Sequence, residues 1–288
     1  MRRVAIGMLV AVVGLALGAA DATPSTAGPQ PFGYDASAPL DVVLGQSLSS
    51  QGIVRQELTY AVTPSLRLKA YFVHPASGGP WPLVIWSPGY GGDRRQQLPE
   101  ARATARLGVA SLLVDETFPA KSCDAAEDLR AFTSNVVSRR RAVDLAGTLS
   151  NVDSTRIAAA GFSYGASIAA ALSGVEHRIV AVALKSGRGH FTGYATTFCR
   201  SLGRQGLALY TRQLGGVDAV HWVRSATHGA FLIQNGKADS LSPRPDVLAL
   251  YAAARGVKEL RWYPAGHDLN AAATAYRVQW LVRRLRVR

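Results

Sequence analysis

Runs of apolar residues recur along the chain from about residue 57 onward. The first two runs, 57–63 and 66–73, alternate apolar with polar residues, and this alternation predicts a pair of antiparallel strands. The later runs are short and apolar throughout, as in strands that are buried on both faces of a sheet. They cover 82–86, 109–114, 156–160, 179–184, 230–234 and 260–263. The pattern predicts a sheet of about eight strands.

Longer stretches with helical periodicity separate the apolar runs. They cover 96–107, 125–150, 166–172, 243–255 and 268–286. The stretch 125–150 has acidic residues at its start and arginines further on, which suits the charge distribution of a helix dipole. Buried strands that alternate with helices indicate an α/β fold, in which helices cover both faces of a mostly parallel central sheet.

Two parts of the chain do not follow this alternation. Residues 23–55 are rich in Pro, Gly, Ser and Ala, and they predict a loosely ordered N-terminal lead-in. Residues 187–228, hereafter the insert, contain glycines and aromatic residues without a simple periodicity, and they predict an excursion that acts as a cap. We therefore expect one α/β domain over residues 56–288, which carries the insert.

The first 22 residues have the features of a secretory signal peptide. Arg2 and Arg3 give a positive start, residues 4–18 are uncharged and apolar, and Ala-Asp-Ala at 20–22 offers a cleavage site. Cleavage would leave a secreted or periplasmic protein without a stable membrane span. The apolar run is nearly long enough to cross a bilayer, so an uncleaved anchor stays open as the alternative.

The composition suits one sizeable core and adds a strong basic charge. The chain has 288 residues, of which 48% are hydrophobic, and a formal net charge of +13. Such a charge can favour anionic surfaces or polymers. The basic residues are scattered, apart from 139–141 and 283–288, and no basic motif interleaved with aromatic residues is present. We therefore expect no nucleic-acid partner.

Cys123 and Cys199 are the two cysteines of the chain. In an exported protein an even pair suggests a disulfide, and two buried free thiols are the alternative. The sequence contains no H-E-x-x-H pattern, no close cysteine and histidine cluster, and no phosphate-binding Walker loop. We therefore expect neither a metal nor a cofactor.

The sequence Gly-Phe-Ser-Tyr-Gly at 161–165 joins the apolar run 156–160 to a helical stretch. The pattern G-x-S-x-G between a strand and a helix predicts a nucleophile elbow, a strained turn that presents the serine hydroxyl at the start of the helix. Glycine is needed on both sides, because a side chain there would crowd the neighbouring strand and helix. Ser163 is therefore the candidate nucleophile.

A serine nucleophile needs a base that takes its proton and an acid that orients the base. His267 follows the last apolar run, and Asp239 follows the run 230–234. Both residues should lie in loops at the carboxyl edge of the sheet, the edge that also carries Ser163. The order serine, aspartate, histidine is the one expected with this elbow. We predict His267 as the base and Asp239 as the acid.

Other acids and histidines are weaker candidates. Asp246 falls within a predicted helix, Asp218 lies in the insert, and Asp268 is better placed to cap the final helix. Three further histidines could line a pocket or could be polar surface residues: His190, His221 and His228.

Acyl transfer also requires hydrogen-bond donors for the developing oxyanion. One predicted donor is the backbone N–H of Tyr164, the residue after the nucleophile. The second should come from the glycine-rich loop 87–92, where we predict the N–H of Tyr90, with Gly91 as the alternative. Four aromatic residues are candidates for the substrate pocket, and each could equally belong to the core: Trp86, Phe191, Tyr194 and Trp222.

Together these motifs resemble those of the α/β-hydrolase superfamily, and within it the dienelactone hydrolase and prolyl-oligopeptidase-like serine esterases. The resemblance covers roughly residues 56–288. It rests on the segments 83–92, 156–165, 235–239 and 265–267. It implies an α/β-hydrolase fold and acyl hydrolysis without a metal or cofactor.

Two departures from the family pattern matter. Many relatives have a histidine at the start of the oxyanion loop, where this chain has Ser87 and Pro88. Dienelactone hydrolases use a cysteine nucleophile, where this chain has Ser163. The second difference favours a serine esterase over a dienelactone hydrolase.

The sequence thus predicts an exported serine hydrolase that cleaves carboxylic esters, small or polymeric, through an acyl-enzyme. A secreted peptidase or aminoacyl hydrolase is one alternative on the same fold, although residues 23–55 are too few for the large extra domain that such peptidases usually carry. A polyester or lipid hydrolase is another. A non-catalytic binding scaffold is the alternative of a different class.

Overall fold

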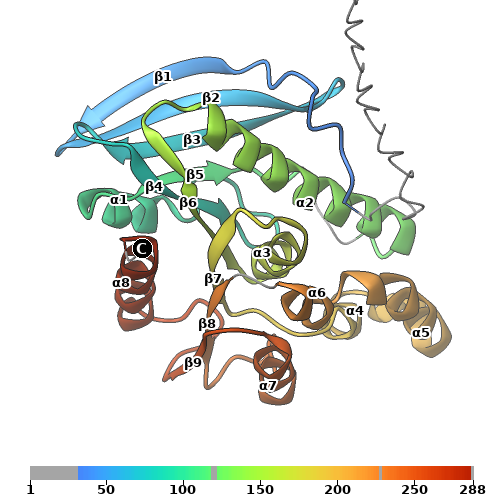
Figure 1. Ribbon diagram of the computed structural model, residues 1–288. Helices are drawn as coiled ribbons and strands as arrows, with labels where there is room; N and C mark the ends of the chain where they lie inside the picture. The colour runs from blue at the N-terminus through green and yellow to red at the C-terminus, as the bar shows by residue number, and fades with distance from the viewer. Residues whose placement is uncertain (1–31, 118–121, 227–228, 287–288) are drawn as a thin grey trace, which may run out of the picture. The chain divides into compact units, whose positions relative to one another are not determined.

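The computed structural model of the protein describes residues 32–117, 122–226 and 229–286. A sheet of nine strands runs through this part of the chain, and helices cover both of its faces (Figure 1). The mostly parallel α/β architecture predicted from the sequence is confirmed, with one strand more than expected. The predicted signal peptide, residues 1–22, lies outside the described residues.

The elements of the fold alternate along the chain. The strands are β1 (Val43–Ser50), β2 (Ile53–Thr63), β3 (Leu66–Pro75), β4 (Trp81–Ser87), β5 (Ala110–Val114), β6 (Val152–Phe162), β7 (Ile179–Lys185), β8 (Ala230–Gly236) and β9 (Lys258–Tyr263). The helices are α1 (Leu98–Arg106), α2 (Ala125–Thr148), α3 (Tyr164–Val175), α4 (Thr192–Phe198), α5 (Gly203–Leu214), α6 (Ala219–Ser225), α7 (Arg244–Ala253) and α8 (Ala271–Arg286). In the described ranges, none of the helices combines the length and the apolar character that a membrane crossing requires.

The sheet has an antiparallel end and a longer parallel part. Its order is β1-β2-β3-β5-β4-β6-β7-β8-β9. β1, β2 and β3 pair antiparallel in sequence order, and β3 pairs antiparallel with β5. From β5 to β9 all neighbours are parallel. The parallel strands therefore end at one edge, where the loops that follow them come together.

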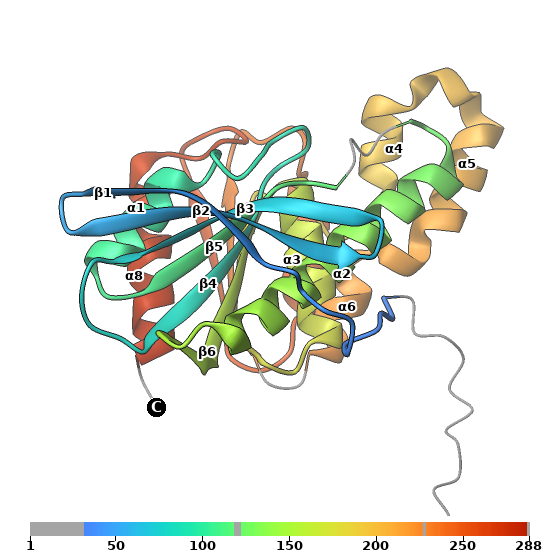
Figure 2. The same cartoon turned by 90° about the horizontal axis from the view of Figure 1, so that it is seen from above.

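Strand β4 explains why the apolar runs of the sequence are continuous. All seven of its residues are buried. Leu83 and Ile85 belong to the core on the side of α2 and α3, whereas Val84 and Trp86 belong to the core on the side of α1 and α8. Successive side chains of a strand point to opposite faces, so a strand with helices on both sides is apolar at every position. Figure 2 shows the two helix layers on opposite sides of the sheet.

The lead-in is more ordered than the sequence predicted. β1 and the first residues of β2 lie within the segment 23–55 and extend the sheet by one strand. All eight residues of β1 are exposed. The strand therefore lacks the alternation of apolar and polar positions that reveals a half-buried strand in a sequence.

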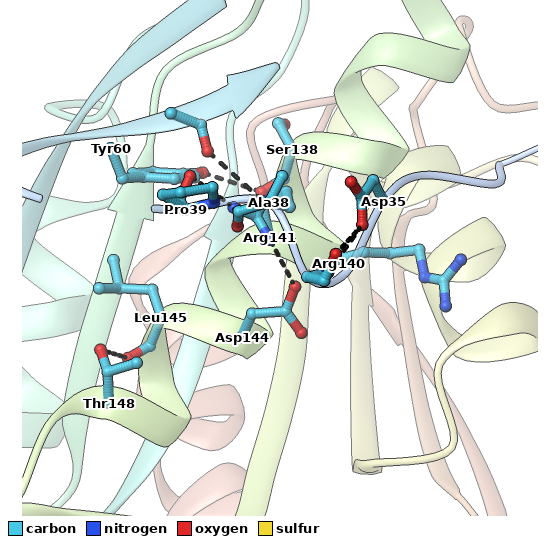
Figure 3. Close-up of polar contacts among 12 residues, drawn as sticks. Asp35, Ala38, Pro39, Tyr60, Ser138, Arg140, Arg141, Asp144, Leu145 and Thr148 are labelled. Carbon is cyan, nitrogen blue, oxygen red and sulfur yellow. Dashed lines mark hydrogen bonds and ion pairs between the residues drawn. The ribbon is translucent and has the colours of Figure 1, made fainter. Parts of the chain in front are cut away.

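Arginines of α2 bind the backbone at the start of the described chain, and Figure 3 shows the contacts of Arg141. Arg141 Nη2 donates hydrogen bonds to the carbonyl oxygens of Ala38 and Pro39, at 2.7 and 3.0 Å. Arg140 Nη1 donates to the carbonyl oxygen of Phe32 at 2.9 Å. Two members of the basic run 139–141 thus satisfy this chain's own carbonyl groups, which holds the lead-in against α2.

The insert folds into helices, although the sequence predicted no regular element there. α4 and α5 lie beyond one end of α2 (Figure 2), and α6 packs on α3. None of the three has a side-chain hydrogen bond at its N-cap, and α4 and α6 have seven residues each. Phe191 and Leu202, at the N-caps of α4 and α5, are not residue types that mark a helix start in a sequence, whereas Asp218 before α6 is such a type.

A disulfide ties the insert to α2. It joins Cys123, which lies just before α2, to Cys199 at the end of α4, with the two Cα atoms 5.5 Å apart. Asp124, the residue after Cys123, is the N-cap of α2. Its carboxylate accepts the backbone N–H groups of Ala126 and Glu127 at 2.9 Å. The covalent link therefore meets α2 at a well-capped helix start.

The turn from β6 to α3 depends on two glycines. Ser163 lies between them with a φ of 54° and a ψ of −114°, a conformation that costs roughly 1–3 kcal/mol for a residue with a side chain. A Cβ on Gly161 would collide with the backbone of Gly165. A Cβ on Gly165 would collide with the carbonyl groups of Ser87 and Pro88, at the end of β4. The sharp strand–turn–helix predicted from the motif is present.

We expect Gly165→Ala to destabilise the domain. The added Cβ would meet backbone atoms at the end of a central strand, which cannot move without displacing the strand, so the free energy of unfolding should fall by roughly 1–3 kcal/mol. Gly147→Ala is the matched control, because a Cβ at this position in α2 would have no atom within 4 Å. Urea denaturation of both variants gives the difference, and equal stabilities would contradict the packing argument.

Replacing both cysteines with serine should lower the free energy of unfolding by roughly 2–4 kcal/mol, because the disulfide closes a long loop, with a sequence separation of 76. Reduction of the unmodified protein should have the same effect on its urea midpoint. Alkylation of the native protein without reductant should add no mass. Two alkylated thiols under these conditions would disprove the pairing.

Candidate active site

Ser163, His267 and Asp239 come from three loops at the carboxyl edge of the sheet and form a continuous chain of hydrogen bonds. Ser163 Oγ lies 2.8 Å from His267 Nε2. His267 Nδ1 lies 3.0 and 2.9 Å from the two carboxylate oxygens of Asp239. An ionised carboxylate can only accept, so Nδ1 carries the proton and Nε2 is left to accept the proton of the Ser163 hydroxyl.

The acid is held by the backbone around it. The Asp239 side chain is fully buried in the loop after β8. One of its oxygens accepts the backbone N–H groups of Leu241 and Ser242, at 2.9 and 3.1 Å. Burial of a carboxylate is tolerated when its oxygens are satisfied in this way, and the same bonds fix the direction in which it faces His267.

The loop of the base is held by neighbours on both sides. The Ser186 hydroxyl, just after β7, donates a hydrogen bond to the carbonyl oxygen of His267. The Phe162 ring lies with its centroid 5.2 Å from that of the imidazole. A Cβ on Gly236 would collide with the carbonyl groups of Ala265 and Gly266, so glycine at the end of β8 allows this loop to approach. Sequence reasoning missed Ser186, whose one signal is its place directly after a buried strand.

The residue after the nucleophile contributes its backbone to this edge and its side chain to the core. Tyr164 is the first residue of α3, so its N–H belongs to the helix end, where backbone donors have no partner within the helix and the dipole favours negative charge. The Tyr164 ring packs edge-on against Phe132, with centroids 5.9 Å apart. Burial raises the pKa of the Tyr164 hydroxyl well above its usual value.

Most backbone N–H groups of the glycine-rich loop after β4 are already engaged. The N–H of Gly89 donates to Gln96 Oε1 at 2.6 Å, and that of Gly92 donates to the Gly89 carbonyl at 2.9 Å. The N–H of Gly91 donates to Glu116 Oε2 at 3.1 Å. The N–H of Gly91, the alternative oxyanion donor predicted from the sequence, is therefore already bound to a carboxylate.

A buried arginine that the sequence did not single out braces this loop. Arg139 in α2 is fully buried, and its Nε donates to the Ser87 hydroxyl at 3.2 Å. Its two Nη atoms donate to the carbonyl oxygens of Asp115 and Val114 at the end of β5, at 3.1 and 3.2 Å. Burial lowers the pKa of Arg139. Ser87 thus serves as an acceptor for a side chain that joins two neighbouring loops.

All four predicted pocket residues are buried. Trp86 is buried beneath α1 and α8 and donates its indole N–H to Ser111 at 3.0 Å. Phe191 and Trp222 are buried within the cluster on the other face. Tyr194 is buried in the same cluster, and its ring centroid lies 5.1 Å from that of Phe191. A role in the substrate pocket stays a prediction for these residues, since an aromatic residue near a loop is apolar enough to fill either place.

The rival acids and histidines do not join the triad. Asp246 Oδ1 lies 2.6 Å from His190 Nδ1, and Asp218 accepts the N–H of Phe191 at 2.6 Å. Asp268 is exposed, and the His221 ring packs edge-on against Trp222. His228 lies outside the described residues.

Two wider features bear on the chemistry of the site. No group of three or more His, Cys, Asp or Glu side chains in the described segments is arranged to hold a metal ion. A cavity of about 620 Å³ lies between residues 33–38, the end of β2, and α2, and its lining does not include the triad. Cavity size therefore does not identify the candidate active site, whereas the hydrogen-bonded triad does.

Comparison with known proteins shows similarity in structure only. The chain matches no protein-family model and no curated protein. It is similar to the solved structure of an acetyl xylan esterase from Paenibacillus sp. R4, with a TM-score of 0.72 and 19% identity over 85% of this chain and 89% of that one. For acetyl xylan esterase 1 from Thermoanaerobacterium sp. JW/SL YS485 the TM-score is 0.68, with 18% identity over 86% of this chain and 89% of that one.

A third similar structure is an S-formylglutathione hydrolase from Agrobacterium tumefaciens, with a TM-score of 0.62 and 16% identity over 84% of this chain and 99% of that one. All three similarities extend over most of both chains at low identity, so they establish the fold. The order of the sheet, its parallel centre and these neighbours together show that the chain has the α/β-hydrolase fold.

Proposed function

We propose that the protein is an exported serine hydrolase that cleaves carboxylic esters through an acyl-enzyme. The observation that carries the proposal is the chain of hydrogen bonds from Asp239 through His267 to the Ser163 hydroxyl, at the start of α3. The names of the similar structures, acetyl xylan esterases and an S-formylglutathione hydrolase, support ester hydrolysis as the reaction.

The first half of the proposed reaction forms the acyl-enzyme. Ser163 Oγ attacks the ester carbonyl carbon while His267 Nε2 takes the hydroxyl proton, and Asp239 stabilises the imidazolium that results. The tetrahedral intermediate then collapses. The bond to the alcohol oxygen breaks, and His267 returns the proton to this leaving group, so that the acyl group remains on Ser163.

The second half repeats the same steps with water. The oxygen of a water molecule attacks the acyl carbon while His267 accepts a proton from this water. The proton then passes to Ser163 Oγ as the ester bond between the acyl group and the enzyme breaks. The products are the carboxylic acid and the alcohol. Each step uses groups that this chain supplies, and no cofactor takes part.

The oxyanion of both intermediates is the charge that must be stabilised. We assign this role to the backbone N–H groups of Tyr164 and Tyr90. The first lies at the positive end of α3, and the second lies in the loop that Gly165 allows to approach this helix start. Loss of one such donor typically costs about 100- to 1,000-fold in rate.

Export remains part of the proposal. The basic start and apolar run of residues 1–22 support a cleaved signal peptide. The disulfide between Cys123 and Cys199 agrees with an oxidising compartment, because such bonds are rare in the cytosol. The insert, with α4, α5 and α6, is proposed as a cap over the edge that carries the triad.

Ser163→Ala should abolish ester turnover. The protein without residues 1–22 should hydrolyse short p-nitrophenyl esters and leave aminoacyl anilides largely intact. The variant should lose at least about 1,000-fold in kcat, because it lacks the attacking oxygen. Ser65→Ala is the control, since Ser65 is exposed in the turn between β2 and β3. Equal ester turnover by Ser163→Ala, or faster cleavage of anilides than of esters, would refute the proposal.

Asp239→Asn should lower kcat by roughly 1,000- to 10,000-fold with little change in KM, because an amide can no longer hold the imidazole in the tautomer that accepts the serine proton. Asp268→Asn tests the acid next to the histidine in the sequence. Asp268 is exposed, so its replacement should change kcat by less than about threefold. Steady-state kinetics of the two variants decide between the acids, and the opposite ranking would refute the assignment.

A further inference from the structure

Arg188, in the first residues of the insert, is buried with unsatisfied donors. The residue is 3% exposed. Its Nε and Nη1 atoms are shielded from solvent and have no hydrogen-bond partner in the described parts of the chain. A buried guanidinium normally has its donors paired, because their desolvation is otherwise uncompensated. The unmet donors of Arg188 therefore require an explanation.

The neighbours of Arg188 only partly neutralise it. Its Nε lies 3.5 Å from Asp246 Oδ2, outside normal hydrogen-bond distance. The other oxygen of Asp246 is much closer to His190 Nδ1, at 2.6 Å. The guanidinium also lies against the backbone of Gly193, where a Cβ would collide with it. The site thus leaves the planar fork of the guanidinium without a matched carboxylate.

Arg188 packs against Tyr194 near the edge of the sheet that carries the triad. The Arg188 guanidinium carbon lies 4.6 Å from the centroid of the Tyr194 ring. Burial raises the pKa of Tyr194, while Arg188 and the hydroxyls of Ser167 and Ser163 oppose this rise. Arg188 also lies close in the chain to residues at the edge that carries the triad. Two residues before it, the Ser186 hydroxyl donates to the carbonyl oxygen of His267, and a Cβ on Gly187 would lie 3.1 Å from the Cβ of Ala166 in α3.

We propose that Arg188 binds a carboxylate of the substrate, so that the enzyme prefers esters that carry an anionic group a few bonds from the scissile carbonyl. This inference rests on the proposed ester hydrolysis and adds the class of substrate. A carboxylate presents two oxygens to the two donors of a guanidinium, which gives both affinity and orientation. The anionic group belongs either to the acyl part or to the alcohol, and the two sources are separable by experiment.

A purely structural role for Arg188 is less consistent with these contacts. An arginine that stabilises the fold, such as Arg139, donates hydrogen bonds from each of its nitrogens. Arg188 has in their place one long ion pair and one contact with a ring. Replacement by a methionine of similar length removes the charge and keeps much of the packing, so the two roles predict different results.

The test compares two pairs of esters that differ in a carboxylate. The first pair, mono-4-nitrophenyl glutarate and 4-nitrophenyl valerate, places the carboxylate in the acyl part. The second pair, 4-acetoxybenzoate and 4-tolyl acetate, places it in the alcohol. In at least one pair the unmodified enzyme should show the higher kcat/KM for the acidic ester. Arg188→Met should lower this acidic-to-neutral ratio by roughly 10- to 100-fold.

Matched variants separate charge from packing. Arg212→Met removes a positive charge from the exposed face of α5, and it should leave the acidic-to-neutral ratio at its original value. Arg188→Lys keeps the charge but not the fork, so it should retain only part of the ratio. If Arg188→Met fails to fold, the proposal is still tested by the acidic-to-neutral ratio of the unmodified enzyme and by the change of this ratio in Arg188→Lys. A preference for the neutral ester in both pairs, or an unchanged ratio in the variants, would overturn the proposal.

Binding distinguishes failure of this inference from failure of the proposed reaction. Titration calorimetry of glutarate and of the uncharged valeramide with Ser163→Ala, and with Ser163→Ala/Arg188→Met, needs no turnover. Glutarate should bind at least about 10-fold more weakly to the double variant, whereas the affinity for valeramide, which has no carboxylate, should not depend on Arg188. If glutarate binds both proteins equally, the subsite is wrong even when the esters are cleaved. If the esters are not cleaved but glutarate binding depends on Arg188, the proposed reaction is wrong and the anion site stands.

Discussion

The close approach of the start of α3 to the end of β4 is the constraint on which the candidate site depends. Gly165 lies so near the carbonyl groups of Ser87 and Pro88 that no side chain fits between them. This contact brings the loop with the proposed oxyanion donor next to the helix that carries the nucleophile. Gly161 allows the same turn to be tight, because a side chain there would collide with the backbone of Gly165. Ser163 adopts a positive φ in this turn, and its hydroxyl faces His267.

Buried polar side chains from distant parts of the sequence then hold the surrounding loops. Arg139 in α2 bonds to the ends of β4 and β5. On the opposite face, Arg277 in α8 donates to Gln234 at 2.8 Å and to Glu100 at 2.9 Å, which joins α8 to β8 and α1. Removing one member of such a buried group leaves the others unsatisfied, so these side chains act together. The donors of Arg139 and Arg277 are bound to other groups of the protein, whereas two donors of Arg188 have no hydrogen-bond partner among the described residues. We propose that these donors bind the substrate.

The sequence was sufficient for the centre of the fold and for the sharp turn that carries Ser163, because the signals there are local. β4 is apolar at every position, and the elbow needs glycine at two fixed places, so both features can be read from short segments. The edge strand β1 was missed because all its residues face solvent. The helices of the insert were missed because they are short and lack side-chain caps.

The roles of single side chains in packing were the least predictable. Trp86, Phe191, Tyr194 and Trp222 were candidates for a pocket or for the core, and all four are buried. Arg139 and Arg188 look alike in the sequence, but one is saturated with hydrogen bonds and the other is not. Such differences arise from contacts between residues far apart in the chain, which no local pattern encodes.

The central claim is that the fold makes one serine nucleophilic. Its most direct test is covalent trapping with a fluorophosphonate, which reacts with a serine activated by a neighbouring histidine and leaves a stable phosphonyl ester. Peptide mass spectrometry of the treated protein should find a single adduct, on Ser163, and prior denaturation should abolish it because the hydrogen-bonded triad is then lost. An adduct on another residue, or no adduct on the native protein, would contradict the account.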